Sequence, residues 1–281
     1  MDAIDYAEKA KEIFVLSDSF LRIKELIDDE RSTISDIGDV ILLDPALSGT
    51  LLKLANSSFF NYPGKIDTIS KAVLVLGITE VYNLVIAYFT TEAFKSIEAD
   101  EEYLEDFWSR SVDCALFIKY LGFHLKVPNA ERLFILGLLH NLGELVIQQF
   151  SPEKVPECAD TRKGKLPWNN QQQALDFTYG ECTAELLKLW QLPFSLVEPI
   201  RYQDEDDFEL STLETKLLYV SKRLAFIHGG TATSGFNDVV EQAKLESCHI
   251  TEDVYKEAAD YCDMERLGIL SILSPSAATI Y

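Results

Sequence analysis

Three polar residues lie in the middle of a mostly apolar stretch between Arg132 and Phe150. They are His140, Asn141 and Glu144, within the sequence RLFILGLLHNLGELVIQQF. His140 and Glu144 are four residues apart, so a helix would place both side chains on one face. An imidazole in such a place can bind a metal ion or transfer a proton. Because Leu and Ile fill most of the remaining positions, the helix is predicted to be buried, and its polar groups need partners.

A second interpretation of His140 is a core histidine that hydrogen bonds hold in place, and we favour it. The other three histidines form no metal-binding spacing with His140. The sequence also lacks an HExxH motif, a glycine-rich phosphate loop and a GxSxG nucleophile elbow. Since no base is placed beside a cysteine or serine, Cys114 and Cys182 are predicted to be core residues.

The segments on both sides of this stretch carry helical periodicity and helix caps. Asp44 and Pro45, for example, suit the cap and first position of a helix, and Gly77 separates two helices. No segment alternates as a strand does. The fold is therefore predicted to be all-α, with helices over residues 6–15, 18–29, 33–43, 45–58, 69–76, 79–94, 107–126, 132–150, 171–190, 193–203, 213–228, 236–246 and 251–272.

Charge and composition exclude several classes of protein. The 281 residues carry a formal net charge of −21, which repels phosphate backbones and argues against nucleic acid and anionic membranes as partners. The helices beside Gly77 are accordingly interpreted as packed helices, not as a DNA-binding pair. Five scattered cysteines without a CxxC motif indicate reduced thiols. With no signal peptide and no clear membrane span, we expect a soluble cytoplasmic protein.

An acidic run, IEADEEYLE from Ile97 to Glu105, is interpreted as a subdomain boundary. We expect an N-terminal helical subdomain over residues 1–100 and a second helical subdomain over residues 101–281. No Gly/Ser-rich linker separates them, so they are expected to pack together.

Three long segments resemble one known family. They are LLDPALSGTLLKLANSSFFNYPGKIDTISKAVLVLGITEVYNLVIA at residues 42–87, FILGLLHNLGELVI at residues 134–147 and LLKLWQLPFSLVEPIRYQDE at residues 186–205. Together they resemble the HDOD domain, the HD-related output domain of bacterial signalling proteins, over residues 17–206 and more weakly to residue 225. The resemblance implies a multi-helical bundle related to the HD phosphohydrolases, with the HD-like part in residues 101–281.

The same resemblance implies where a metal site would lie. In active members of the superfamily, histidines and aspartates hold metal ions that activate a water molecule. Those ligand positions correspond here to Arg110, His140, Asn141, Gly180, Gln203, Asp204 and Lys222, with Glu144 as a supporting residue. Only His140 keeps a ligand of the expected type, and two positions are cationic, which opposes a divalent ion. We therefore expect neither a metal nor another cofactor, and no catalytic residues.

Two functions follow as hypotheses. The first, which we favour, is a non-catalytic signal-transduction module that acts as an output or scaffold domain. It would bind a protein partner in bacterial signalling, or a small molecule in the cleft between the two subdomains. The alternative is a metal-dependent phosphohydrolase with a remodelled site, in which Asp176, Glu181 or Asp204 replaces the lost ligands.

The two cations suggest what replaced the metal. Without a metal, the carboxylates of such a site would face one another at a cost in free energy. We expect Arg110 and Lys222 to point into the site and to pair with acidic groups such as Asp204 or Glu144. The alternative is that both project into solvent.

Overall fold

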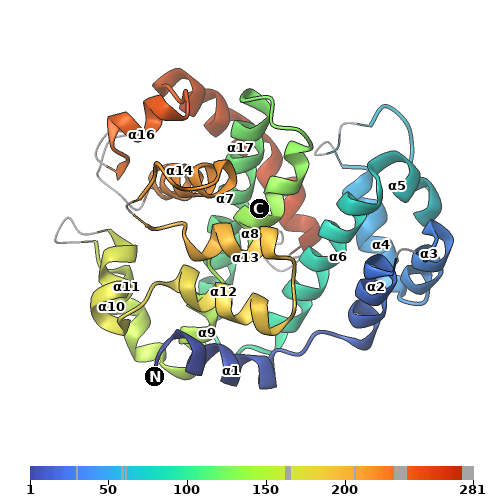
Figure 1. Ribbon diagram of the computed structural model, residues 1–281, viewed down its shortest axis with the longest axis horizontal. Coiled ribbons are helices and arrows are strands. Elements are labelled where there is room, and N and C mark those ends of the chain that lie inside the picture. Colours follow the sequence, from blue (N-terminus) through green and yellow to red (C-terminus); the bar gives the residue numbers. More distant parts are fainter. Residues whose placement is uncertain are drawn as a thin grey trace. The chain divides into compact units, whose positions relative to one another are not determined.

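The computed structural model describes residues 1–29, 31–57, 60, 62–161, 166–205, 207–230 and 239–273, and these residues form helices and connecting loops without a strand. The all-α fold is therefore confirmed for the described part of the chain (Figure 1). The chain divides into two compact units. Unit 1 contains residues 1–14 and 97–264, and unit 2 contains residues 15–96 and 265–281.

The helices of unit 2 that begin at Asp18, Ile34, Pro45 and Ile69 each have a side-chain cap, as the sequence predicts, whereas the helix that begins at Ile78 has none. Asp44, for example, accepts hydrogen bonds from the backbone N–H groups of Ala46 and Leu47, both at 3.0 Å. Gly77 has φ +86°, a conformation that favours glycine, and the chain bends by 118° between the helices on its two sides. The helices are α2 (Asp18–Asp28), α3 (Ile34–Leu42), α4 (Pro45–Ala55), α5 (Ile69–Leu76) and α6 (Ile78–Ala93), followed by the 3₁₀ turn η1 (Phe94–Ser96).

Unit 1 is built around α7 (Glu101–His124), which packs against α8 (Leu133–Leu139) and α14 (Leu213–His228). The acidic run predicted as a boundary supplies the first turn of α7. The remaining helices are α1 (Ala3–Ile13), η2 (Ala130–Arg132), α9 (Gly143–Phe150), η3 (Pro152–Lys154), α10 (Val155–Ala159), α11 (Pro167–Leu175), α12 (Tyr179–Leu189), α13 (Phe194–Arg201), α16 (Gln242–Ser247) and the first part of α17 (Glu252–Leu273).

The first helix, α1, belongs to unit 1, which differs from the expected division at residue 100. It packs on α12 and α9. The hydroxyls of Tyr6 and Ser151 lie 2.7 Å apart, and Trp190 donates its indole N–H to the carbonyl of Phe14 at 3.1 Å. At the other end, the division falls within α17, so residues from 265 onward belong to unit 2. Each unit thus contains two segments that are distant in sequence.

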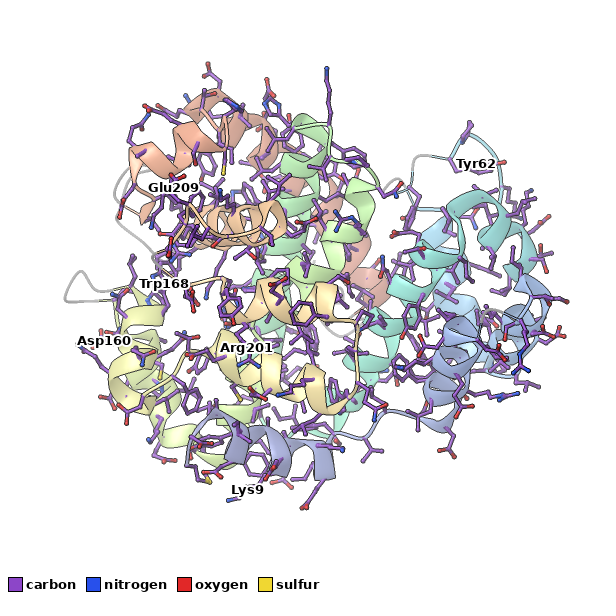
Figure 2. The ribbon with its side chains drawn as sticks, viewed as in Figure 1. Lys9, Tyr62, Asp160, Trp168, Arg201 and Glu209 are labelled. Atoms are coloured by element: carbon purple, nitrogen blue, oxygen red, sulfur yellow. The ribbon has the colours of Figure 1, made fainter. Side chains whose placement is uncertain are left out.

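Predicted helix ends differ from the structure where a turn depends on one residue. The predicted helix over 171–190 is two helices, because Asp176 adopts a left-handed φ of +66° and ends α11. Thr178 then caps α12 in a capping box with Glu181. Part of the predicted helix over 236–246 lies outside the described residues, and α16 covers its end. Between neighbouring helices, side chains form bonds such as that of Arg201 on α13 to Glu185 on α12, at 2.6 Å (Figure 2).

Two apolar segments of the described chain pass a test of length and composition for membrane spans. One is residues 133–150, and the other is the bent pair 69–76 and 78–96. Of the segment from residue 133 to residue 150, a share of 78% is buried inside the protein. A buried core helix passes the same test, so this is weak evidence for a membrane span.

Candidate functional site

The predicted helix over residues 132–150 is broken at His140, Asn141 and Leu142. These residues form a turn between α8 and α9, so the single helix expected from the sequence is wrong at this point. Its apolar residues from Leu133 to Ile147 are nevertheless buried as expected, and Phe150 at its end is half-buried. The break lies at the polar pair, and this position suggests that side chains replace part of the backbone hydrogen bonding.

Three side chains supply those replacement bonds. The Nδ1 of His140 lies 2.6 Å from the carbonyl of Gly137 and donates to it, because a carbonyl can only accept. Gln203 donates to the carbonyl of His140 at 2.7 Å, and the N–H of Gly143 donates to the Thr183 hydroxyl at 2.7 Å. These bonds pair the carbonyls of Gly137 and His140 and the first N–H of α9, which are groups that a helix end leaves without a backbone partner.

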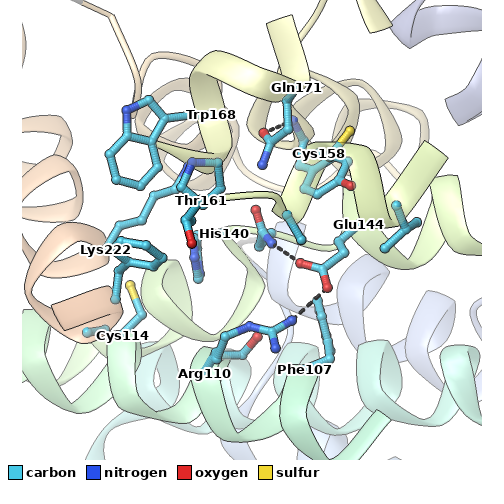
Figure 3. A pocket seen from close by; sticks show the side chains of 18 of the residues that line it. Phe107, Arg110, Cys114, His140, Glu144, Cys158, Thr161, Trp168, Gln171 and Lys222 are labelled. Atoms are coloured by element: carbon cyan, nitrogen blue, oxygen red, sulfur yellow. Dashed lines mark hydrogen bonds and ion pairs between the residues drawn. The ribbon is translucent and has the colours of Figure 1, made fainter. Parts of the chain in front are cut away.

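A cavity of about 530 Å³ lies in unit 1 beside this turn (Figure 3). Figure 3 shows His140 between Lys222 on one side and Glu144 on the other. The walls of the cavity come from six helices and the segments beside them. The lining residues are Tyr103, Phe107, Arg110, Ser111 and Cys114 of α7; His140, Asn141 and Glu144; Val155, Pro156, Cys158, Ala159 and Thr161; Pro167, Trp168 and Gln171 of α11; Tyr179; and Lys222, Ala225 and Phe226 of α14.

One wall of the cavity holds a carboxylate with three donors. Glu144 pairs with Arg110 at 2.6 Å, and the hydroxyl of Tyr103 donates to the same oxygen at 3.2 Å. Asn141 donates to the other Glu144 oxygen at 2.7 Å. Burial and the neighbouring Glu144 charge raise the pKa of Tyr103, so its hydroxyl stays protonated and remains a donor. The expected pairing of Arg110 with Glu144 is present.

A second ion pair lies on the α14 side. Lys222 donates to Asp204 at 2.6 Å, and Arg223 lies 3.5 Å from the other oxygen of that carboxylate. Trp168 covers both cations, with its ring centre 5.3 Å from the Lys222 nitrogen and 4.2 Å from the Arg223 guanidinium carbon. Burial lowers the pKa of Lys222, and the Asp204 charge opposes that shift. The expected pairing of Lys222 with Asp204 is also present.

His140 is a neutral imidazole between these two clusters. Burial is the main cause that lowers its pKa, from 6.5 to about 3, and the charges of Lys222 and Arg110 add to the shift. Since Nδ1 carries the proton that bonds to Gly137, Nε2 is an unprotonated acceptor. It makes no hydrogen bond with the described part of the chain.

The structure brings the predicted site residues together in two layers. Five of them, Arg110, His140, Asn141, Glu144 and Lys222, line the cavity. The other three lie behind that layer and do not line it. Gln203 is fully buried and holds the turn at His140, and Asp204 neutralises Lys222. Gly180 packs so closely on Gln203 that an added Cβ would lie 2.4 Å from its amide nitrogen.

These residues do not fit a catalytic metal centre. Among the described residues, no three His, Cys, Asp or Glu side chains are grouped so that they could share a metal ion. The proposed replacement ligands have other roles. Asp176 is exposed at the end of α11, Glu181 caps α12, and Asp204 is paired with Lys222. The two cations, Arg110 and Lys222, at positions where the family resemblance implies ligands, oppose a divalent ion.

Sequence reasoning missed much of the apolar wall. Trp168, Phe107 and Phe226 line the cavity, yet their types and positions resemble ordinary core residues. Cys114, predicted to be a core residue, is buried and also lines the cavity, and burial raises the pKa of its thiol. The irregular segment after Ser151 could have drawn attention, since its prolines start η3, α10 and α11 and so turn the chain around the cavity.

A sequence comparison shows the family. The HDOD domain family matches residues 13–206, so the chain belongs to the HDOD domain family. An uncharacterised protein of Treponema pallidum (strain Nichols) is 26% identical over 238 residues, which is 82% of this chain. This chain spans 45% of the length of that relative.

Solved structures show the same fold. A protein of Shewanella amazonensis SB2B, named as a candidate phosphohydrolase, aligns with a TM-score of 0.72 and 24% identity over 97% of this chain and 98% of its own. An HDOD domain protein of unknown function from Geobacter sulfurreducens aligns with a TM-score of 0.69 and 18% identity. The alignment covers 97% of this chain and 96% of that protein. A candidate signal transduction protein of Marinobacter aquaeolei VT8 aligns with a TM-score of 0.70 and 21% identity. The alignment covers 98% of this chain and 66% of that protein.

Proposed function

We propose that this protein is a non-catalytic, cytoplasmic signal-transduction module of the HDOD type that responds to a small molecule or a protein partner. The observation that carries the proposal is the pair of ion pairs at the cavity. Arg110 and Lys222 occupy positions where the family resemblance implies a histidine and an aspartate, and each neutralises a carboxylate. A site that is already charge-balanced has little attraction for a divalent cation.

The cavity supports ligand binding as the input to such a module. Its volume of about 530 Å³ lies within the range typical of small-molecule sites, and its surface is mostly apolar, with polar side chains from several helices. The small-molecule site expected between two subdomains is therefore proposed here within unit 1.

The alternative of a phosphohydrolase has one supporting observation. His140 has the tautomer that metal-binding histidines commonly have, with Nδ1–H bonded to a backbone carbonyl and Nε2 open. Two further oxygen or nitrogen ligands would still be needed beside it, and the other implied ligand positions that line the cavity hold an amide and two cations.

Hydrolysis of phosphoesters distinguishes the two functions. Wild-type protein and the His140→Ala variant are assayed side by side with 4-nitrophenyl phosphate and bis(4-nitrophenyl) phosphate in the presence of Mn²⁺. We expect the same background rate from both proteins, since a contaminating enzyme would copurify with either. Turnover by the wild type that disappears in His140→Ala would show catalysis at this site and would overturn the proposal.

A further inference from the structure

The charged groups that face the cavity favour an anionic ligand. Both oxygens of Glu144 already accept hydrogen bonds, so this carboxylate has little capacity left for a ligand. Arg110 uses one nitrogen for Glu144, and the rest of its guanidinium, with a side chain 41% exposed, remains available. Lys222 also lines the cavity, whereas its partner Asp204 does not. Two cations therefore line the cavity, whereas the one carboxylate among the lining residues, Glu144, is already hydrogen bonded at both oxygens.

The apolar part of the cavity suits a flat ring system. Phe107 on α7, Trp168 on α11 and Phe226 on α14 contribute rings from three helices. The ring centres of Trp168 and Phe226 are 5.9 Å apart with an interplanar angle of 72°, so they form a corner. A planar aromatic ligand can stack on one ring while its edge meets the other.

His140 adds a requirement for a donor. Its side chain is 6% exposed and lines the cavity, and its Nε2 has a lone pair without a partner in the described part of the chain. A buried acceptor of this kind is stabilised by a ligand N–H or O–H group. The lowered pKa of the imidazole supports this assignment, because the group remains unprotonated at neutral pH.

We propose that the cavity binds a small organic anion whose flat aromatic body carries an N–H or O–H donor. The anionic group would meet Arg110 and Lys222, the ring would lie against Trp168, and the donor would reach His140. This inference rests on the proposed function, because it treats the cavity as a ligand site that performs no chemistry.

Three indole compounds test the three parts of this chemistry by isothermal titration calorimetry at neutral pH. Indole-3-acetate has the ring, the N–H and the charge. Indole-3-acetamide lacks the charge, and 1-methylindole-3-acetate lacks the donor. We expect indole-3-acetate to bind about tenfold more tightly than either analogue, as loss of one charge-assisted or one buried hydrogen bond implies.

Variants assign the effect to residues. Arg110→Gln should weaken indole-3-acetate about tenfold and leave the acetamide within about twofold, whereas Arg110→Lys should retain a preference for the anion. Arg22→Gln is the matched control, because Arg22 also pairs with a glutamate, Glu25, but on the exposed surface of α2. It should bind like the wild type. His140→Leu should bind indole-3-acetate and 1-methylindole-3-acetate with equal affinity. Thermal unfolding of each variant checks that it is folded.

Two results would overturn this inference. One is that indole-3-acetate gives no heat of binding up to about 1 mM. The dissociation constant would then exceed about 1 mM, and the free energy of binding would be weaker than about 4 kcal/mol. The other is equal affinity for the acetate and the acetamide in the wild type. Neither result affects the proposal of a non-catalytic module, which fails only if phosphoester turnover depends on His140.

Discussion

At the scale of single residues, the surroundings of His140 decide its chemistry. The same residue type can bind a metal, shuttle a proton or pack in a core. Here burial and two neighbouring cations favour the neutral ring, and the carbonyl of Gly137 fixes its tautomer. His140 is therefore a hydrogen-bonded histidine, as we favoured from the sequence, but one whose second nitrogen faces a cavity.

The shifted pKa of His140 predicts a pH-dependent stability. In the unfolded chain the imidazole binds a proton below about pH 6.5, whereas the folded protein binds it only near pH 3. The unfolded state thus holds more protons between these values, so stability falls as pH drops through this window, by about 1.4 kcal/mol per pH unit at most from this group. Urea unfolding between pH 7 and pH 4.5 measures the slope. The free energy of unfolding of His140→Gln should depend less steeply on pH. His124 is exposed, so His124→Gln should keep the wild-type slope. Equal slopes in all three proteins would contradict the assignment.

The residues that could be predicted at this site are those with an unusual charge for their position. Arg110 and Lys222 are cations where the family resemblance implies a histidine and an aspartate, and from that contrast their pairing with Glu144 and Asp204 could be expected. Trp168 carries no such signal. Its contact with Lys222 depends on how α11 packs on α14, which local sequence does not determine.

At the scale of helices, Gly137 controls how closely α8 approaches α7. A Cβ on this residue would lie 2.4 Å from the Cα of Ala115, which is backbone and cannot move alone. The close approach places His140 beside Arg110 and Cys114 across the same interface. A glycine is therefore needed at this position for close packing, although glycine has a low helix propensity.

Substitution of this glycine should separate the two helices. Gly137→Ala is expected to reduce the free energy of unfolding by about 2–3 kcal/mol through overpacking. Gly49 in α4 is the matched control, because a Cβ there meets nothing within 4 Å. Gly49→Ala should stabilise the protein by about 0.5–1 kcal/mol through helix propensity. Chemical denaturation of both variants checks the opposite signs, and a Gly137→Ala variant as stable as the wild type would be inconsistent with the packing.

Most helices could be predicted because their signals are local. Thr33, Asp44 and Thr68 cap helices through bonds to residues two or three positions away. The break at His140 could not, because the groups that replace the backbone bonds come from distant residues. Gln203 is 63 residues from His140 along the chain, and Thr183 is 40 residues from Gly143. The resemblance to the HDOD family suggested the site without revealing this break.

At the scale of the whole molecule, sequence order does not follow the two units. The acidic run begins at residue 97, directly after a segment of unit 2 ends at residue 96. Composition could not show that α1 belongs to unit 1, because an amphipathic helix can pack against any apolar surface. The buried side chains of Tyr6 and Phe14, and their contacts, make that assignment.

Phe14→Ala tests this assignment in the full-length chain. The side chain is fully buried, so its loss should cost about 3–5 kcal/mol. Hydrogen exchange should become faster in α12, which packs on α1, with little change in α4 of unit 2. The neighbouring Ile13 is 45% exposed, and Ile13→Ala should have a small effect. Faster exchange confined to α4 would show that α1 does not belong to unit 1.

The central claim is that ion pairs have replaced a metal at the former ligand positions, and metal content tests it most directly. Elemental analysis of protein purified without chelators should find well below one equivalent of any transition metal. The variant Arg110→His/Asn141→Asp/Lys222→Asp, which supplies anionic or neutral ligands, should take up more Mn²⁺ or Fe²⁺ than the wild type under the same conditions. One equivalent of metal in the wild type, lost in His140→Ala, would contradict the account.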